Sequence, residues 1–210
     1  MSGGGPCCGI GGVHSHIESA VAGETLLGCI DIEGVVCLNE RVPDSGRNVF
    51  RAWETRDEMS AAALLESDDD DPELLLYVPF TQQVRLRNIT VIGGTPSTSP
   101  SSVRLFANRD DLDFSTVAEL TPLQVIELVA DPSRASNVEY PVKPQKFFNV
   151  SSVTMHFPAS YGGDNTQIRY ICFRGEATQN RRGIVDARYE ATAIPTDHEK
   201  AEDFVAPSIL

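Results

Sequence analysis

Four side chains near the N-terminus have the chemistry of soft-metal ligands: Cys7, Cys8, His14 and His16. Zinc prefers four such ligands, but structural zinc sites usually space their cysteines two to four residues apart. Adjacent cysteines strain that geometry, so accessible thiols in a flexible arm are the favoured interpretation. We therefore expect no metal site and no cofactor. A thiol-based redox accessory role remains open as an alternative.

The other thiols and one histidine are expected to be structural. Cys29, Cys37 and Cys172 each lie beside Ile or Leu and are interpreted as small core hydrophobes. His156 lies in an alternating run and is expected on the polar, surface face of a strand rather than as a catalytic base. No GxSxG elbow, HExxH helix, GxxxxGK[ST] loop, GxGxxG turn or CxxC pair occurs in the sequence. We predict that the protein is not an enzyme, with no catalytic residues.

The densest charge feature is the run from Glu66 to Glu73. One interpretation is a solvated loop whose Asp and Ser side chains cap turns. A calcium loop is a second, although the DxDxDG spacing is absent. The third is an anionic patch that docks a basic partner surface. Under this third interpretation, the candidate partner-binding residues are Asp68, Asp69, Asp70 and Asp71. Trp53 is a further candidate as an aromatic anchor, and its alternative interpretation is a core residue.

Charge and hydropathy exclude several classes of protein. The chain has 210 residues, 41% of them hydrophobic, and a formal net charge of −13. Such acidity disfavours direct binding to nucleic acid or to anionic membranes, because both depend on Lys and Arg. No apolar run reaches the ~20 residues of a membrane helix, and the N-terminus lacks the pattern of a secretory signal. We expect a monomer located in the cytoplasm and also in the nucleus.

Short alternating runs separated by Gly, Pro, Asn and Asp dominate the middle of the chain, and they predict strands. The expected strands are 73–80, 84–92, 102–108, 124–129, 147–157 and 167–176. Strict alternation would put Arg85, Arg87, Ile89 and Val91 on one face of the second strand. The single convincing helix candidate lies between Trp53 and Glu66.

Five arginines fall within expected strands. They could form a small basic face, or each could pair across strands with an acidic neighbour. They are Arg85, Arg87, Arg104, Arg169 and Arg174.

Many short strands with little helix predict an all-β protein, built as an antiparallel sandwich or barrel with one short helix at most. The expected domain organisation is a flexible Gly/Cys/His-containing arm at 1–23, a β-sandwich domain at 24–195 and a tail at 196–210.

Several segments taken together resemble the PITH domain, which stands alone in some proteins and follows thioredoxin in a proteasome-associated thioredoxin-like protein. The resemblance covers about Thr25 to Pro195 and is closer to the stand-alone branch. It rests on Cys37–Glu40, the Trp53 region, Glu66–Asp70 leading into Leu74–Phe80, Val84–Ile92, Ser102–Asn108, Lys146–Val150 and Gly175–Glu176.

The resemblance implies a jelly-roll β-sandwich similar to galactose-binding-like domains, without catalytic residues, and an association with the proteasome. The leading hypothesis is a non-catalytic protein-interaction module that associates with the proteasome or a similar large assembly. A second hypothesis, from fold analogy alone, is a small-ligand or glycan-binding domain with exposed aromatics near Tyr140 or Tyr161.

Overall fold

The computed structural model describes residues 23–58 and 60–181. The cysteine and histidine arm, the C-terminal tail and the expected domain boundary at 195 lie outside the described residues. The strands are β1 (Glu24–Thr25), β2 (Val36–Leu38), β3 (Leu65–Glu66), β4 (Leu74–Gly93), β5 (Ser102–Ala107), β6 (Gln124–Glu127), β7 (Tyr140–Pro141), β8 (Val150–Phe157) and β9 (Gln167–Arg181). The helices are α2 (Phe114–Glu119) and α3 (Pro132–Ala135), with 3-10 turns η1 (Leu27–Cys29), η2 (Ile32–Gly34), η3 (Ser45–Val49), η4 (Trp53–Thr55) and η5 (Ala61–Ala63).

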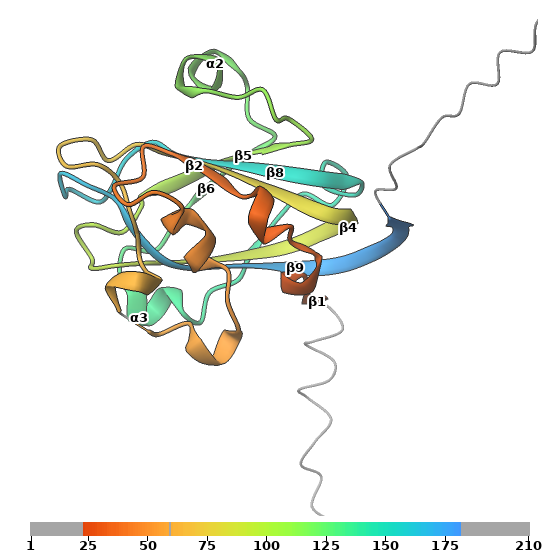
Figure 1. Ribbon diagram of the computed structural model, residues 1–210, viewed down its shortest axis with the longest axis horizontal. Helices are drawn as coiled ribbons and strands as arrows, with labels where there is room; N and C mark the ends of the chain where they lie inside the picture. Colours follow the sequence, from red (N-terminus) through yellow and green to blue (C-terminus); the bar gives the residue numbers. More distant parts are fainter. Residues whose placement is uncertain (1–22, 59, 182–210) are drawn as a thin grey trace, which may run out of the picture.

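β4 is a 20-residue strand that organises the sheet. Its first half, Leu74–Pro79, pairs with β8 on one side, and Leu75–Tyr77 pairs with β2 on the other. Its second half pairs with β9 and, briefly, with β7. The main path runs β1-β9-β4-β8-β5-β6, and every pairing is antiparallel. In Figure 1, β4 runs between β8 and β9. The two strands expected at 73–80 and 84–92 are thus one strand.

The main hydrophobic core is formed by inward-facing side chains of β4, β5, β8 and β9. Inward residues alternate along β8 as expected, with Val153, Met155 and Phe157 buried in the core. They meet apolar side chains from β4, β5 and β9, including Leu74, Leu76, Val78, Val103, Leu105, Ile171 and Phe173. Burial of this apolar surface is the main term that stabilises the fold.

Strict alternation fails in the second half of β4. Leu86 pairs with Gly175 and Asn88 with Arg174, so Arg87 is an extra residue on the β4 side. Such a bulge reverses the facing of every residue that follows it. Ile89 therefore joins the main core together with Leu86, and the expectation that it shares a face with Arg87 is wrong.

The helix expected between Trp53 and Glu66 is replaced by the two 3-10 turns η4 and η5. Ser60, just before η5, has extended backbone angles. The Arg51 guanidinium donates to the carbonyl oxygens of Glu58 and Ala63, at 3.1 and 3.3 Å. These carbonyls are bonded by a side chain from outside the segment, whereas an α-helix would bond them to its own N–H groups.

Two short α-helices occur elsewhere in the described part of the chain, each after an aspartate cap. Asp113 accepts the Thr116 N–H before α2, and Asp131 accepts the Ser133 N–H before α3. Hydrogen bonds from Thr116 and Ser115 lower the pKa of Asp113 to about 2. Capping aspartates are a recognised signal of helix starts, but helices of six and four residues are too short to add a clear apolar period to that signal.

α2 covers the outer face of the sheet, above β5 and β8 in Figure 1. Its Val117 is buried against Leu75 and Phe106, and Phe114 and Leu120 pack around them. The antiparallel all-β class is confirmed, and the described residues contain two short α-helices where at most one was expected.

Candidate functional site

The residues Asp68 to Asp71, called here the acidic loop, form a turn between β3 and β4 in which all four side chains are exposed. The Asp68 N–H donates to the Asn39 carbonyl at 3.1 Å. The Asn39 amide in turn donates to the carbonyls of Asp71, at 3.3 Å, and Glu73, at 2.7 Å. A residue next to β2 therefore holds both ends of the loop.

Carboxylates of the acidic loop also cap their own backbone. Asp68 accepts the Asp69 N–H at 3.0 Å, and Asp71 accepts the Glu73 N–H at 3.1 Å. Asp69 forms an ion pair with Arg41 at 3.0 Å. Within the described part of the chain, no ion pair is found for Asp68, Asp70 or Asp71. The loop thus presents carboxylates to solvent from a hydrogen-bonded backbone.

Trp53 lies in a different environment. Its ring meets Tyr170 edge-on, with centroids 6.0 Å apart, and joins the small cluster of Ile92, Tyr170 and Cys172 as a partly buried member. The Arg56 and Arg174 guanidinium groups lie 4.2 and 5.6 Å from its ring centroid. Across residues 23–58 and 60–181, no hydrogen bond, ion pair or ring contact joins Trp53 to the acidic loop. The contacts of Trp53 fit its alternative interpretation as a packing residue.

His156 is buried, which corrects the expectation of a surface position. Its side chain is 3% exposed, and Nε2 lies 2.7 Å from Oε1 of Glu73. Burial lowers the pKa of His156, and the contact with Glu73 opposes this effect. β8 lies between β4 and β5. On the outer face of these two strands, Leu75 of β4 and Phe106 of β5 pack against α2. A covered outer face explains why the polar side of this strand is not at the surface.

The His156–Glu73 pair lacks the third member of a hydrolytic site. Nδ1 of His156 is buried and has no hydrogen-bond partner among the described residues. A histidine and a carboxylate activate a nucleophile only when a hydroxyl or thiol is bonded to the free ring nitrogen. The pair is a partly buried polar contact between the residue just before β4 and the end of β8.

The described cysteines are free thiols, with Cys172 buried and Cys29 and Cys37 partly buried. Burial, together with the charge of Glu40, raises the pKa of the Cys37 thiol. A raised pKa disfavours the reactive thiolate. Cys29 and Cys37 pack against the main core, as expected for small hydrophobes. The Cys7 and Cys8 thiols lie outside the described residues, so their redox role remains a hypothesis.

The strand arginines pair with acidic residues. Glu176 on β9 accepts from Arg87 at 3.0 Å and from Arg85 at 3.4 Å. Arg174 pairs with Glu139 at 3.0 Å. Pairing across β4 and β9 confirms the cross-strand interpretation for Arg85 and Arg87, whereas the partner of Arg174 lies just before β7, outside a strand. Arg169 is buried and cannot add to an exposed basic face, while Arg104 is partly exposed.

The tyrosines proposed for a glycan site divide into one buried and one exposed residue. Tyr140 is buried, and its hydroxyl accepts the Val129 N–H at 2.8 Å. Tyr161 is exposed, while its hydroxyl donates to the Leu128 carbonyl. Tyr140 is thus unavailable to a ligand, which corrects that part of the expectation.

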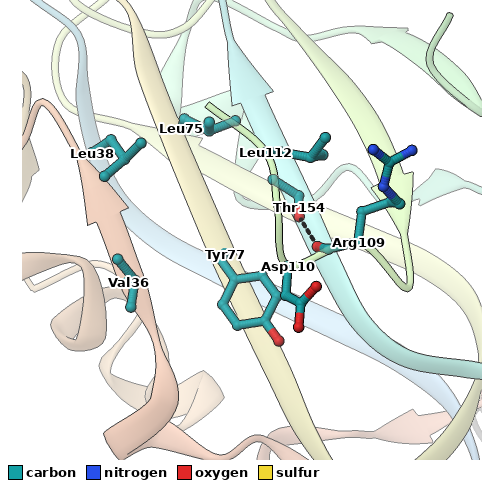
Figure 2. A pocket seen from close by; sticks show the side chains of 8 residues that line it. All are labelled: Val36, Leu38, Leu75, Tyr77, Arg109, Asp110, Leu112 and Thr154. Carbon is teal, nitrogen blue, oxygen red and sulfur yellow. Dashed lines mark hydrogen bonds between the residues drawn. The ribbon is translucent and has the colours of Figure 1, made fainter. Parts of the chain in front are cut away.

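A pocket of about 290 Å³ opens on the outer face of the sheet, between β2 and the segment that follows β5. We call it the β2 pocket. Its apolar wall consists of Val36 and Leu38 from β2, Leu75 from β4, and Leu112. Figure 2 shows these side chains around Tyr77, with Thr154 donating to the Arg109 carbonyl at 3.0 Å. Asp110 completes the lining.

Sequence reasoning missed the β2 pocket. The alternation of Val36, Cys37 and Leu38 could have indicated a strand with two apolar residues on one face. Nothing in the local sequence indicated that this face would remain uncovered. In the structure, Val36 is 51% exposed.

Two further features are absent from the described residues. No helix there is long and apolar enough to cross a membrane. No cluster of three or more His, Cys, Asp or Glu side chains converges there to hold a metal ion.

Comparison with known sequences gives one family. The model of the PITH domain matches residues 18–193. PITH domain-containing protein 1 of Xenopus laevis is 40% identical over 174 residues, which are 82% of this chain and 80% of that protein. PITH domain-containing protein P35G2.02 of Schizosaccharomyces pombe is 39% identical and covers 84% of each chain. The human PITH domain-containing protein 1 is 39% identical over 80% of this chain and 78% of its own length.

Comparison with solved structures gives distant matches to carbohydrate-binding modules and lectins. The module CBM32-3 from a family 31 glycoside hydrolase of Clostridium perfringens overlaps 70% of this chain and 95% of its own, with a TM-score of 0.48 and 13% identity. A fucolectin from striped bass serum overlaps 68% of this chain and 46% of its own, with a TM-score of 0.48 and 9% identity. Matches this distant do not transfer a ligand.

Proposed function

This chain belongs to the PITH domain family, and from that premise we propose that it is a non-catalytic protein-interaction module that associates with the proteasome or a similarly large assembly. The proteasome is the partner that the family resemblance implies. The proposal places the protein in the cytoplasm and the nucleus, where proteasomes work.

The observation that supports this proposal is the acidic loop. Its four carboxylates are exposed, while Asn39 holds the backbone at both ends. A preorganised anionic loop loses little conformational freedom when it binds. It also attracts a basic surface over about 8 Å at physiological ionic strength, which raises the rate of association.

The test is affinity isolation of the full chain from cell lysate at low and moderate salt. We expect proteasome subunits to be enriched by the wild-type chain. Replacing the four aspartates of the acidic loop with asparagine should reduce that enrichment about tenfold at low salt, because the steering charge is lost. Quantitative mass spectrometry of the isolated proteins measures the effect.

A matched control removes four exposed acidic charges elsewhere. Its substitutions, Asp to Asn and Glu to Gln, are made at Glu54, Asp57, Glu58 and Glu127. This variant should retain the enrichment. Equal enrichment by the wild-type chain and by an unrelated protein of the same net charge would refute the proposed function.

A further inference from the structure

The β2 pocket is apolar, and its outer wall belongs to a strand with exposed side chains. Val36 is 51% exposed and Leu38 is 37% exposed, although both lie on a strand paired with the central β4. Exposed aliphatic side chains that line a concave site are typical of interaction surfaces. The pocket therefore needs an occupant with an apolar group.

The β2 pocket is large enough to admit an aliphatic side chain of a partner. Its volume of about 290 Å³ is at the lower end of small-molecule sites, which span roughly 300–1,000 Å³. A protein segment that inserts one aliphatic side chain fits this volume.

The β2 pocket and the acidic loop are linked through two neighbouring residues of the chain. Leu38 forms the wall of the pocket, and the next residue, Asn39, bonds to the backbone at both ends of the loop. An extended peptide rises about 3.3 Å per residue. A segment anchored in the pocket can therefore reach the loop within a few residues of its anchor.

The charge around the pocket is negative. The one lining cation, Arg109, donates to both oxygens of Asp111 at 2.6 and 2.8 Å, and its guanidinium points away from the β2 side chains in Figure 2. Asp110 at the pocket is exposed, and no ion pair is found for it within the described ranges. Asp69 is paired with Arg41, so the nearby charge available to a ligand is that of Asp110, Asp68, Asp70 and Asp71.

We propose that the β2 pocket and the acidic loop form one docking surface for an extended, basic segment of a partner protein. A leucine-like side chain of that segment fills the pocket, and flanking Lys or Arg residues contact the loop. This inference rests on the proposed function and specifies the chemistry of the partner.

The test measures binding of two fluorescent synthetic peptides, KKRGLGRKK and KKRGSGRKK, by fluorescence anisotropy. The wild-type chain should bind the leucine peptide at least about tenfold more tightly, because only leucine buries an aliphatic side chain. Leu38→Ser should abolish this preference while leaving the salt dependence unchanged. Val36→Ser is a second variant with the same expected loss.

The matched control is Val125→Ser on β6, an equally exposed valine at 52% that lies outside the pocket. It should retain the preference for leucine. Equal binding of the two peptides by the wild-type chain would overturn the inference, and so would a preference that survives both Leu38→Ser and Val36→Ser. Sedimentation that reveals a dimer abolished by Leu38→Ser would also overturn it, because the pocket would then hold a second copy of this chain.

The two proposals fail separately. If the acidic-loop variant loses proteasome subunits but the wild-type chain does not discriminate between the peptides, the proposed function stands and the docking inference fails. If the peptides are discriminated as expected but no proteasome subunits are enriched, the docking surface stands and the proteasome is the wrong partner.

Discussion

At the scale of single residues, His156 couples stability to pH. It is buried beside Glu73, and burial lowers its pKa from the ordinary value of about 6.5. Arg104 lies opposite His156 on the neighbouring strand β5, and its charge also opposes a positive charge on the ring. The folded state therefore binds fewer protons than the unfolded state when the pH falls below about 6.5.

Stability should consequently fall as the pH drops from 7.5 to 5.5, by at most about 1.4 kcal/mol for each pH unit below the unfolded pKa. Urea unfolding at both pH values measures the change. His156→Gln, which has no titrating ring, should be less stable at pH 7.5 but lose much less stability on acidification. An equally steep loss in both proteins would assign the pH dependence to other groups.

At the scale of structural elements, the close approach of β9 to β4 depends on Gly175. A Cβ atom built on this residue would lie 2.0 Å from the Arg85 carbonyl oxygen. The obstacle is backbone within the paired strands, so a rotamer change cannot relieve it. The same glycine pairs with Glu24 of β1 and thereby joins three strands.

Gly175→Ala should therefore destabilise the fold by about 2 kcal/mol or more, since overpacking against rigid backbone forces the strands apart. Thermal and urea unfolding measure this loss. Gly28→Ala is the matched control, because a Cβ at Gly28 meets no atom within 4 Å. Similar stability of the two variants would contradict this prediction, because it would mean that β9 can move away from β4 at little cost.

At the scale of the whole molecule, net charge opposes compactness. Replacing the acidic loop by asparagines changes the formal charge from −13 to −9. Asparagine oxygens can still accept the N–H groups of Asp69 and Glu73, and the lost Arg41–Asp69 pair is exposed and weak. The capping of the loop should therefore survive the substitution.

We expect the acidic-loop variant to keep its fold and to have a Tm close to that of the wild-type chain. The Tm should rise less with added salt, because there is less self-repulsion to screen. Circular dichroism melting at low and high salt tests this. A large drop in Tm would mean that the carboxylates stabilise the fold, and the capture experiment would then need single substitutions.

The sequence by itself determined the family, the antiparallel all-β class, most strand positions and the location of the acidic loop before β4. These follow from local features, such as alternation along β8 or turn residues at 162–164, that need no knowledge of distant contacts.

The tertiary structure alone decided which faces are covered. α2 lies over the outer face of β4 and β5, so the outward-facing His156 of the adjacent β8 is buried, and the bulge at Arg87 returns Ile89 to the core. The β2 pocket combines Leu38, Leu75 and Leu112, which are far apart in the sequence. Periodicity assigns a residue to a face of its own strand, but coverage of that face depends on packing between distant segments. For this reason the acidic loop could be found in the sequence and the pocket beside it could not.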